Sequence, residues 1–279
     1  MTEPSGAGPA VRQARVRSGL TLRGLASAIG VSVGTMSAIE NGKVALTIDR
    51  LQQIARALDI PPAHLLAPVA EPPEAVESPN GTSDWRHFTE LDLDPALRAA
   101  VEVFTEMGYH GATMRLVATA ADSSVAGIYH YHRSKQHLLV TLMDLTLQDI
   151  EWRVAAADSE GGDAADRFAR MVEALALCHA VRRDLAFISA TEMRSLEDPD
   201  RERIVAVRRR LQDRLDAAAV EATADGAFAT PNPRETARVV ATMCMALPYW
   251  FSAAGPMSPP DVARQYADHA LAMMLVQQN

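Results

Sequence analysis

The chain has 279 residues, of which 48% are apolar and 5% aromatic, and its formal net charge is −8. This composition excludes a disordered chain, and the length predicts about two domains. No apolar run is long enough to cross a membrane, and the first residues lack the pattern of a signal peptide, so we expect a cytoplasmic protein without a membrane partner. Cys178 and Cys244 are expected to be free thiols.

The net charge conceals a gradient along the chain. Residues 1–67 carry seven basic and four acidic side chains, residues 68–93 carry one and six, and residues 138–279 carry fifteen and twenty-one. Only the first segment has the sign expected of a nucleic-acid binder, so attraction to DNA must come from local patches. The only two lysines, Lys43 and Lys135, each follow a candidate recognition helix.

The predicted fold class is all-α, because Ala, Leu and Arg are abundant and no alternating strand pattern is present. A stretch with four prolines and three glutamates over 68–82 indicates a linker. The predicted segments are a disordered tail (1–9), a five-helix domain (10–67), a linker (68–93), a three-helix domain (94–137) and a helical C-terminal domain (138–279). The predicted helix N-caps are Thr21, Ser32, Thr47, Asp94, Ser134, Asp198, Asn232 and Ser258.

Residues 20–43 (LTLRGLASAIGVSVGTMSAIENGK) predict two short helices joined by a tight turn. Leu25 and Ile29 share one apolar face, Gly30 permits the turn, and Met36 and Ile39 face a core. This geometry lets the second helix protrude into a major groove. A small helical domain that packs on a protein partner would show the same pattern.

The stretch resembles the Cro/phage-repressor (XRE) type of DNA-binding domain over about residues 10–67, through LA…GVS……IENGK and L..IA.AL.I. The resemblance implies that residues 32–37 contact bases and that Asn41 and Lys43 reach phosphates. The expected DNA-contacting residues are Arg23, Ser32, Val33, Gly34, Thr35, Ser37, Asn41 and Lys43. Because this face is short and mostly apolar, we expect thymine-methyl and backbone contacts with modest specificity.

A second helix-turn-helix is predicted after Pro95. Its first helix carries an apolar stripe and ends at Gly108, and Asp122 lies in the turn, where Asp tolerates left-handed φ. Thr113 and Ser124 are predicted to cap the next two helices. The residues expected to face inward are Leu97, Ala100, Val101, Phe104, Met107, Leu116, Val117 and Ala120.

Residues 113–138 resemble the N-terminal domain of the tetracycline-repressor (TetR) family, with Asp122-Ser123 in place of the usual Gly-Val and His132 in place of the usual Phe. The resemblance implies phosphate contacts from Thr113, Ser124, Tyr129, His130 and Lys135, and base contacts from Val125, Ala126 and Gly127. On a helix His130 and His132 face apart, so we expect no metal there, and no cofactor. No catalytic motif is present, and no enzyme is expected.

In this family the C-terminal part binds an effector and dimerises, so the resemblance implies these roles for residues 138–279. Dimerisation is expected through two helices, about 233–253 and 259–276. Their interface candidates are Val239, Val240, Leu247, Tyr266, Ala270, Leu271 and Met274. The effector-pocket candidates are Met171, Leu175, Cys178, Phe187, Met193, Met243, Tyr249 and Trp250, for which ordinary core is the alternative.

The segment resembles domains that sense lipid-like molecules or acyl-CoA thioesters. Arg182-Arg183 or Arg208 to Arg210 are candidates to meet ligand phosphates; solvated faces are the alternative.

The sequence thus predicts a homodimeric, ligand-responsive repressor of a palindromic operator, released by a small hydrophobic or acyl-CoA-like effector. Effector binding is expected to shift the long helix that starts after Ser134 and to change the separation of the two recognition helices. An adaptor whose N-terminal helix-turn-helix contacts a protein is the alternative.

Overall fold

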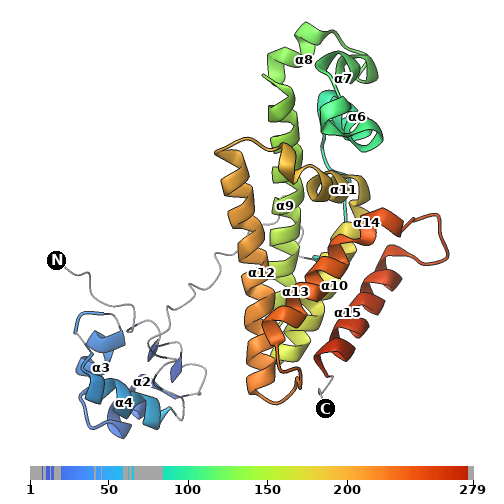
Figure 1. Cartoon of the computed structure of the whole chain (residues 1–279). Helices are drawn as coiled ribbons and strands as arrows, with labels where there is room; N and C mark the ends of the chain where they lie inside the picture. Colours follow the sequence, from blue (N-terminus) through green and yellow to red (C-terminus); the bar gives the residue numbers. More distant parts are fainter. Residues whose placement is uncertain are drawn as a thin grey trace. The chain divides into compact units, whose positions relative to one another are not determined.

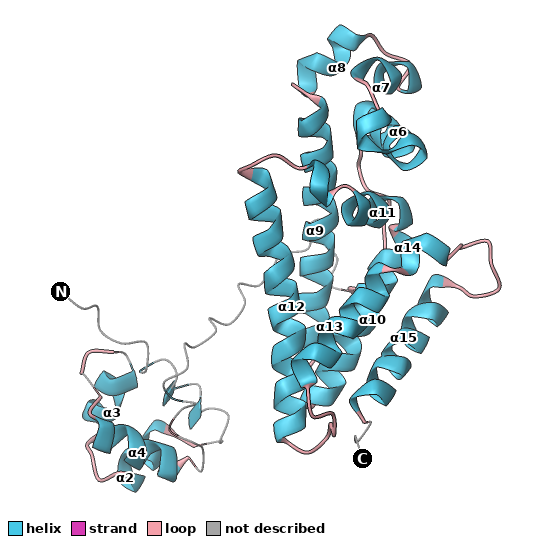
Figure 2. Ribbon diagram, viewed as in Figure 1, coloured by secondary structure: helices cyan, strands magenta, loops and turns pink. Residues whose placement is uncertain are grey.

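The structure is a computed structural model, and it describes residues 8, 11–12, 14–15, 20–40, 42–44, 46–58, 62, 65 and 84–275. The chain divides into two compact units, Met1–Glu74 and Ala75–Asn279, each described by itself (Figure 1). Every regular element within the described residues is a helix, which confirms the predicted fold class (Figure 2).

The first unit contains α2 (Leu22–Ala28), α3 (Val33–Glu40) and α4 (Ile48–Ala57). The side chains of Thr21 and Thr47 cap α2 and α4 as predicted. Among the described helices none is by itself long and apolar enough to cross a bilayer; α2 and α3 pass a length-and-composition test only as a pair bent by 107°. The buried core comprises Val11, Leu25, Ala26, Met36, Ile39, Leu51, Ile54, Ala55, Leu58 and Leu65.

The second unit is a helical bundle with a small three-helix end. Its elements are α6 (Pro95–Gly111), α7 (Met114–Ala120), α8 (Val125–Tyr131), α9 (Lys135–Ser159), α10 (Ala164–Val181), α11 (Arg183–Thr191), the 3-10 helix η1 (Met193–Ser195), α12 (Asp200–Ala224), α13 (Pro233–Met245), α14 (Leu247–Trp250) and α15 (Pro259–Met274). We call α6–α8 the head and α10–α15 the body; α9 joins them.

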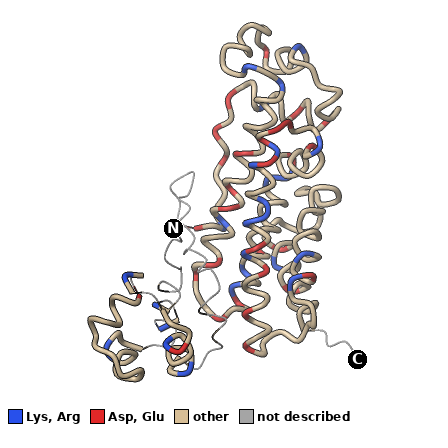
Figure 3. The backbone as a smooth tube through the Cα atoms, turned by 60° about the vertical axis from the view of Figure 1, so that its left-hand side comes forward, with Lys and Arg blue, Asp and Glu red and all other residues tan. Residues whose placement is uncertain are grey.

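Two apolar cores hold this unit together. The body core surrounds α10, which packs against α9, α12, α13 and α15. The second core joins the head to the first half of α9, to α11 and to the start of α12. At 25 residues α9 is about 37 Å long and passes through both cores. Basic and acidic residues alternate along the backbone of the helices of this unit (Figure 3).

Several predicted boundaries are corrected by the structure. The helix predicted over 233–253 is two helices, because Pro248 has no amide hydrogen with which to continue the hydrogen bonds of α13. Asp198 does not cap α12, whose N-cap is Pro199, and Asn232 precedes α13 without a side-chain bond. The predicted end of the first head helix at Gly108 is confirmed as a break: Gly108 has a non-helical conformation (φ 70°, ψ 165°), and the few residues up to Gly111 that α6 includes follow this kink.

Three residues of the head expected to face inward are instead exposed: Met107, Leu116 and Ala120. Val117 and Ala118 are the buried residues of α7, so its inner face is rotated by about one residue from the prediction.

Residues 84–93, predicted as linker, pack against α9 and α10, and we call them the strap. Trp85 is 1% exposed, and its indole Nε1 donates to Glu160 at 2.7 Å. The guanidinium of Arg153, also 1% exposed, donates to the carbonyl oxygens of Trp85 and His87 and pairs with Asp149 at 2.8 Å. Its Cζ lies 3.4 Å from the ring centroid of Phe88. The connection between the two units therefore ends at residue 84.

Replacing Arg153 by Ala is expected to lower the free energy of unfolding by about 3–5 kcal/mol, because it leaves the buried Asp149 carboxylate with Arg182 as its remaining charged partner and the strap carbonyls without a donor. Chemical denaturation measures the change. The matched control is Arg210→Ala, whose pair with Glu151 is solvent-exposed and should cost no more than about 1 kcal/mol. Equal losses for the two variants would contradict this role of Arg153.

Candidate DNA-reading helices and effector cavity

The recognition helix of the first unit, α3, presents the predicted face to solvent. The Ser32 hydroxyl accepts from the amide of Thr35 at 3.0 Å and caps the helix. Val33 and Gly34 are exposed, whereas Met36 and Ile39 are fully buried. Ser37 and Thr35 are half-buried at the edge of this face, and Arg23 and Lys43 are exposed. Asn41 lies outside the described residues.

An ion pair that the sequence analysis missed fixes the end of α3. The guanidinium of Arg15 donates to both carboxylate oxygens of Glu40, at 2.6 and 3.0 Å, and to the carbonyl oxygen of Leu20. Glu40 is 6% exposed, and the bond to it raises the pKa of Arg15. The signal available in the sequence was Glu40 itself, an acidic residue at the end of an otherwise uncharged helix. If such a residue is buried, a basic residue elsewhere in the chain must neutralise it.

The recognition helix of the head, α8, follows a turn of the predicted kind. Asp122 has a φ of 47°, and the hydroxyls of Thr113 and Ser124 cap α7 and α8 at 3.2 and 3.0 Å. Ile128 is the buried residue that holds α8 against the head.

The outer face of α8 carries Ala126, Tyr129 and His130, with Val125 and Gly127 half-buried beside them. Tyr131, 75% exposed, extends this aromatic surface and was missed, although its alternation with the histidines was visible in the sequence. Its ring meets that of His130 edge-to-face at 4.8 Å.

Lys135 is committed to contacts inside the protein. Its ammonium donates to the carbonyl oxygens of Tyr109 and Ala112 at 2.6 and 2.7 Å and lies over the Tyr109 ring. Burial lowers its pKa. Lys135, predicted to contact a phosphate, thus fastens the end of α6 to the start of α9 in this structure.

His132 occupies a buried position between the head and α9. Its Nε2 lies 2.8 Å from Asp94 Oδ2, and Asp94 also caps α6 by accepting from the amide of Leu97. The imidazole therefore ties the turn before α9 to the start of α6, a bond that the usual Phe cannot make. The His137 ring lies 5.4 Å from that of His132, and no group of three metal-binding side chains occurs among the described residues.

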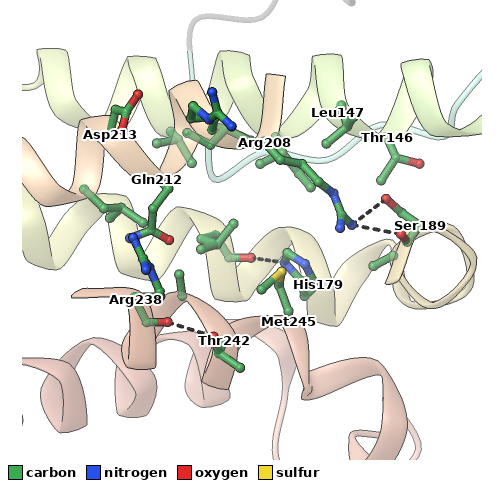
Figure 4. Close-up of a pocket in the computed structure, with 18 of the residues that line it drawn as sticks. Thr146, Leu147, His179, Ser189, Arg208, Gln212, Asp213, Arg238, Thr242 and Met245 are labelled. Atoms are coloured by element: carbon green, nitrogen blue, oxygen red, sulfur yellow. Dashed lines mark hydrogen bonds between the residues drawn. The ribbon is translucent and has the colours of Figure 1, made fainter. Parts of the chain in front are cut away.

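A cavity of about 600 Å³ lies between α9, α10, α11, α12 and α13 (Figure 4). Much of its wall is apolar and comes from Leu147, Ile150, Val154, Leu175, Leu211 and Leu215. The polar wall includes three arginines, Arg208, Arg209 and Arg238, and one acidic residue, Asp213. The cavity thus joins an apolar side to a cationic one.

The arginines of α12 differ according to the direction in which they point. Arg203, Arg210 and Arg214, outside the cavity, form ion pairs with Asp144, Glu151 and Asp158. Within the part of the chain that the structure describes, Arg208, Arg209 and Arg238 have no carboxylate within ion-pair distance.

Arg208 is held among neutral groups. Its guanidinium donates to the carbonyl oxygen and the hydroxyl of Ser189 at 2.8 and 3.2 Å, and burial lowers its pKa. A half-buried guanidinium that donates only to neutral acceptors favours an incoming anion.

His179 supplies a neutral imidazole to the same wall. Its Nδ1 lies 2.7 Å from the carbonyl oxygen of Leu175, which can only accept, so Nδ1 carries the hydrogen. Burial lowers the pKa of His179 to about 4, and Nε2 is left as an acceptor.

Of the eight predicted effector-pocket residues, only Leu175 lines this cavity. Met171 and Cys178 are buried in the body core on other faces of α10, and burial raises the pKa of the Cys178 thiol. Tyr249 and Trp250 are 58% and 52% exposed. The remaining three, Phe187, Met193 and Met243, are half-buried elsewhere. The predicted pocket residues were chosen because they are large and apolar, a property that core residues share. The residues that distinguish the cavity from the core are its arginines.

Arg208 and Arg209 were among the alternatives for a ligand, and both line the cavity, whereas Arg210 does not. Arg182 pairs with Asp149 and donates to the carbonyl of Thr89 in the strap, and Arg183 donates to the carbonyl of Phe251. Neither lines the cavity.

Most predicted dimer residues are buried inside the chain itself. Five of the seven are at most 9% exposed, namely Val240, Leu247, Tyr266, Ala270 and Met274. Helical periodicity identifies a covered face but does not say whether the same chain or a second copy covers it. Val239 is 53% exposed, and Leu271 is half-buried.

Glu192, 8% exposed, connects the body to the head. One carboxylate oxygen accepts from the Tyr109 amide at 3.2 Å, and the other accepts from the Ser195 hydroxyl at 2.7 Å. Gly108 lies against the same carboxylate with a φ of 70°, so a side chain there would be strained. The residue that follows α11 is thereby fixed to the bend of α6.

Comparison with known proteins gives matches in three parts of the chain. Residues 161–274 match the model of the tetracyclin repressor-like C-terminal domain, residues 96–142 that of bacterial regulatory proteins of the tetR family, and residues 11–65 a helix-turn-helix model. No curated protein sequence matches the chain.

Three solved structures illustrate the similarity of the second unit. A tetR-family regulatory protein from Rhodococcus RHA1 is 25% identical, with a TM-score of 0.61. The match covers 66% of this chain and 97% of the Rhodococcus chain. PfmR, a TetR family regulator from Thermus thermophilus, is 28% identical, with a TM-score of 0.58. The match covers 63% of this chain and 97% of PfmR. AibR, solved with isovaleryl coenzyme A and operator DNA, is 23% identical, with a TM-score of 0.57. The match covers 64% of this chain and 96% of AibR, and it shows that the two chains share a fold.

Replacing Lys135 by Met is expected to lower the free energy of unfolding by about 1.5–3 kcal/mol, because two carbonyl oxygens lose a charged donor. The slope of log affinity for a fixed DNA duplex against log salt should stay unchanged. Loss of a phosphate contact would instead reduce that slope by about 0.9. Arg133→Met, at an exposed neighbouring position, is the control and should leave stability unchanged.

Proposed function

The chain belongs to the TetR family of transcriptional regulators, with an additional N-terminal helix-turn-helix domain of the XRE type, and we propose that it is a ligand-responsive repressor. In this proposal a homodimer binds a palindromic operator through its two copies of α8 and releases it when an effector enters the body. The exposed face of α8, formed by Ala126, Tyr129 and His130, would enter the major groove.

The cavity is the observation that carries ligand control. Its volume of about 600 Å³ suits a small molecule. Three arginines that lack carboxylate partners among the described residues face an apolar wall, so the fitting ligand has an anionic group and an apolar part. We propose an acyl-CoA-like or other amphipathic anion, whose apolar part would lie against Leu147, Ile150 and Leu175.

Dimerisation is proposed through the outer faces of α13, α14 and α15. Val239 on α13, Ala246 at the end of α13 and Trp250 on α14 are exposed to solvent. Val239 and Trp250 are each about half exposed, and Leu275 at the end of α15 is 58% exposed. A two-fold axis through this surface would cover these side chains in both copies.

The contacts also suggest how ligand binding reaches the head. Arg208 holds Ser189 on α11, and Glu192 directly after α11 holds the amide of Tyr109 at the bend of α6. An anion that draws the Arg208 guanidinium away from Ser189 would free α11 to move. Because Glu192 joins α11 to α6, that movement would rotate the head and change the spacing of the two α8 helices.

A second candidate function, a protein-contacting adaptor, is favoured by one observation. The outward residues of α3 include none of the Arg, Asn or Gln side chains that make bidentate base contacts. Affinity for DNA that falls steeply with salt, and less steeply once Val33 is replaced by Glu, would count against it.

Replacing Arg238 by Gln is expected to weaken ligand binding by about 10- to 100-fold, because one charge-assisted bond to the anion is lost. Calorimetric titration with isovaleryl coenzyme A, the ligand held by AibR, and with longer acyl-CoA thioesters measures the change. Arg234→Gln, also exposed on α13 but outside the cavity, is the matched control. Equal affinities for wild type and Arg238→Gln would contradict the cavity as the binding site.

Replacing Glu192 by Gln is expected to leave ligand affinity unchanged and to bring the ratio of operator affinities with and without ligand close to one. The charged link between α11 and the Tyr109 amide is weakened, so ligand binding is no longer coupled to the head. The exposed neighbour Glu197→Gln serves as control. If Glu192→Gln responded to ligand as strongly as wild type does, the link would not transmit the change.

A further inference from the structure

The head has few cations available for DNA phosphates. Lys135, which follows the head at the start of α9, donates to carbonyl oxygens within the protein, and Arg98 of the head donates to the carbonyl of Leu93. Arg115 on α7 and Arg133 in the turn before α9 are the remaining exposed basic residues of segment 94–137. Residues 94–137 carry as many acidic as basic side chains, and the body beyond them is acidic. Phosphate neutralisation by the head alone is therefore small.

The first unit has the cations that the head lacks. Its basic residues exceed its acidic ones, and Arg12, Arg23, Lys43 and Arg56 are exposed. In the described part of the chain none of these four has an ion-pair partner, whereas Arg15 pairs with Glu40. The reading face of α3 itself is uncharged before Glu40, so this unit combines electrostatic attraction with weak base discrimination.

The strap sets how far apart the two units can bind. It starts beside Arg153, which lies eighteen residues after Lys135 and therefore about 27 Å along α9 from the head. Eighteen residues separate Leu65 from Asp84, and a chain of that length spans at most about 60 Å. The first unit can therefore reach DNA next to that held by α8.

We infer that the two helix-turn-helix units of one chain bind one continuous stretch of duplex DNA, the first unit supplying most of the phosphate contacts and α8 setting the position. This rests on the proposed operator binding by α8. Each unit alone binds weakly, and the connection raises the local concentration of one unit at the DNA held by the other. The operator is then a composite site, in which an α3 contact flanks each α8 half-site.

The decisive variant shortens the connection. Deleting residues 69–80 leaves six residues between Leu65 and Asp84, which span at most about 25 Å, less than the distance along α9 alone. The matched control keeps the length and scrambles the order of the same twelve residues. The probe is a duplex selected from a random library by the full-length protein, and affinity and footprint are measured over a salt series.

The deletion variant is expected to bind the selected duplex at least about tenfold more weakly, with a shorter footprint and a flatter salt slope, while the scrambled control matches wild type. Val33→Glu, which places an acid on the exposed face of α3, should have the same effect, and Ile48→Glu, at a position 77% exposed on α4, should have none. Wild-type affinity and footprint in both the deletion and Val33→Glu would overturn the inference.

Ala126→Glu on α8 separates this inference from the proposed function. It should abolish positioned binding. If Ala126→Glu kept the wild-type footprint, the proposed operator binding by α8 would be wrong. If Ala126→Glu lost the footprint while the deletion and Val33→Glu kept it, only the inferred composite site would be wrong.

Discussion

The second unit depends on one buried cation, the guanidinium of Arg153. Removing a charge from water is costly unless its donors are all satisfied and an opposite charge is near. Asp149 supplies the opposite charge, and the carbonyl oxygens of Trp85 and His87 accept hydrogen bonds from the Arg153 guanidinium. Because those carbonyls belong to the strap, the cation is stable only when the strap is in place. The strap, in turn, gains a defined course from contacts that no apolar pattern specifies.

This arrangement gives α9 three tasks. Asp149 and Arg153 hold the strap, Leu147 and Ile150 form a wall of the cavity, and Lys135 at the start holds the end of α6. A rigid helix of about 37 Å cannot shift at the cavity without affecting its other contacts. The path through Ser189, α11 and Glu192 gives the body a second connection to the head. Ligand binding can therefore act on the head from both sides, which favours rotation of the head as one body.

Local features of the fold could be predicted from the sequence because neighbouring residues determine them. The caps at Thr113 and Ser124 and the left-handed turn at Asp122 depend on a few adjacent positions. The partners of Lys135 and Arg153 could not be predicted, since they lie on other elements. The same limit applies to the interface: the apolar stripe of α15 was recognised correctly as covered, but the covering surface is the chain's own core.

The cavity shows how a single helix separates structural from functional charge. α12 carries arginines on several faces, and those that face α9 are neutralised by acids there, such as Asp144 and Glu151. Arg208 and Arg209 face the cavity, where the opposing side chains are mostly apolar. Leaving the half-buried guanidinium of Arg208 in such surroundings costs stability, because the neutral Ser189 acceptors compensate its charge only in part. An anionic ligand would supply the missing charge, so ligand affinity would include the relief of this cost. The composition of α12 does not distinguish the two kinds of arginine; only the arrangement of acids on the neighbouring helices does.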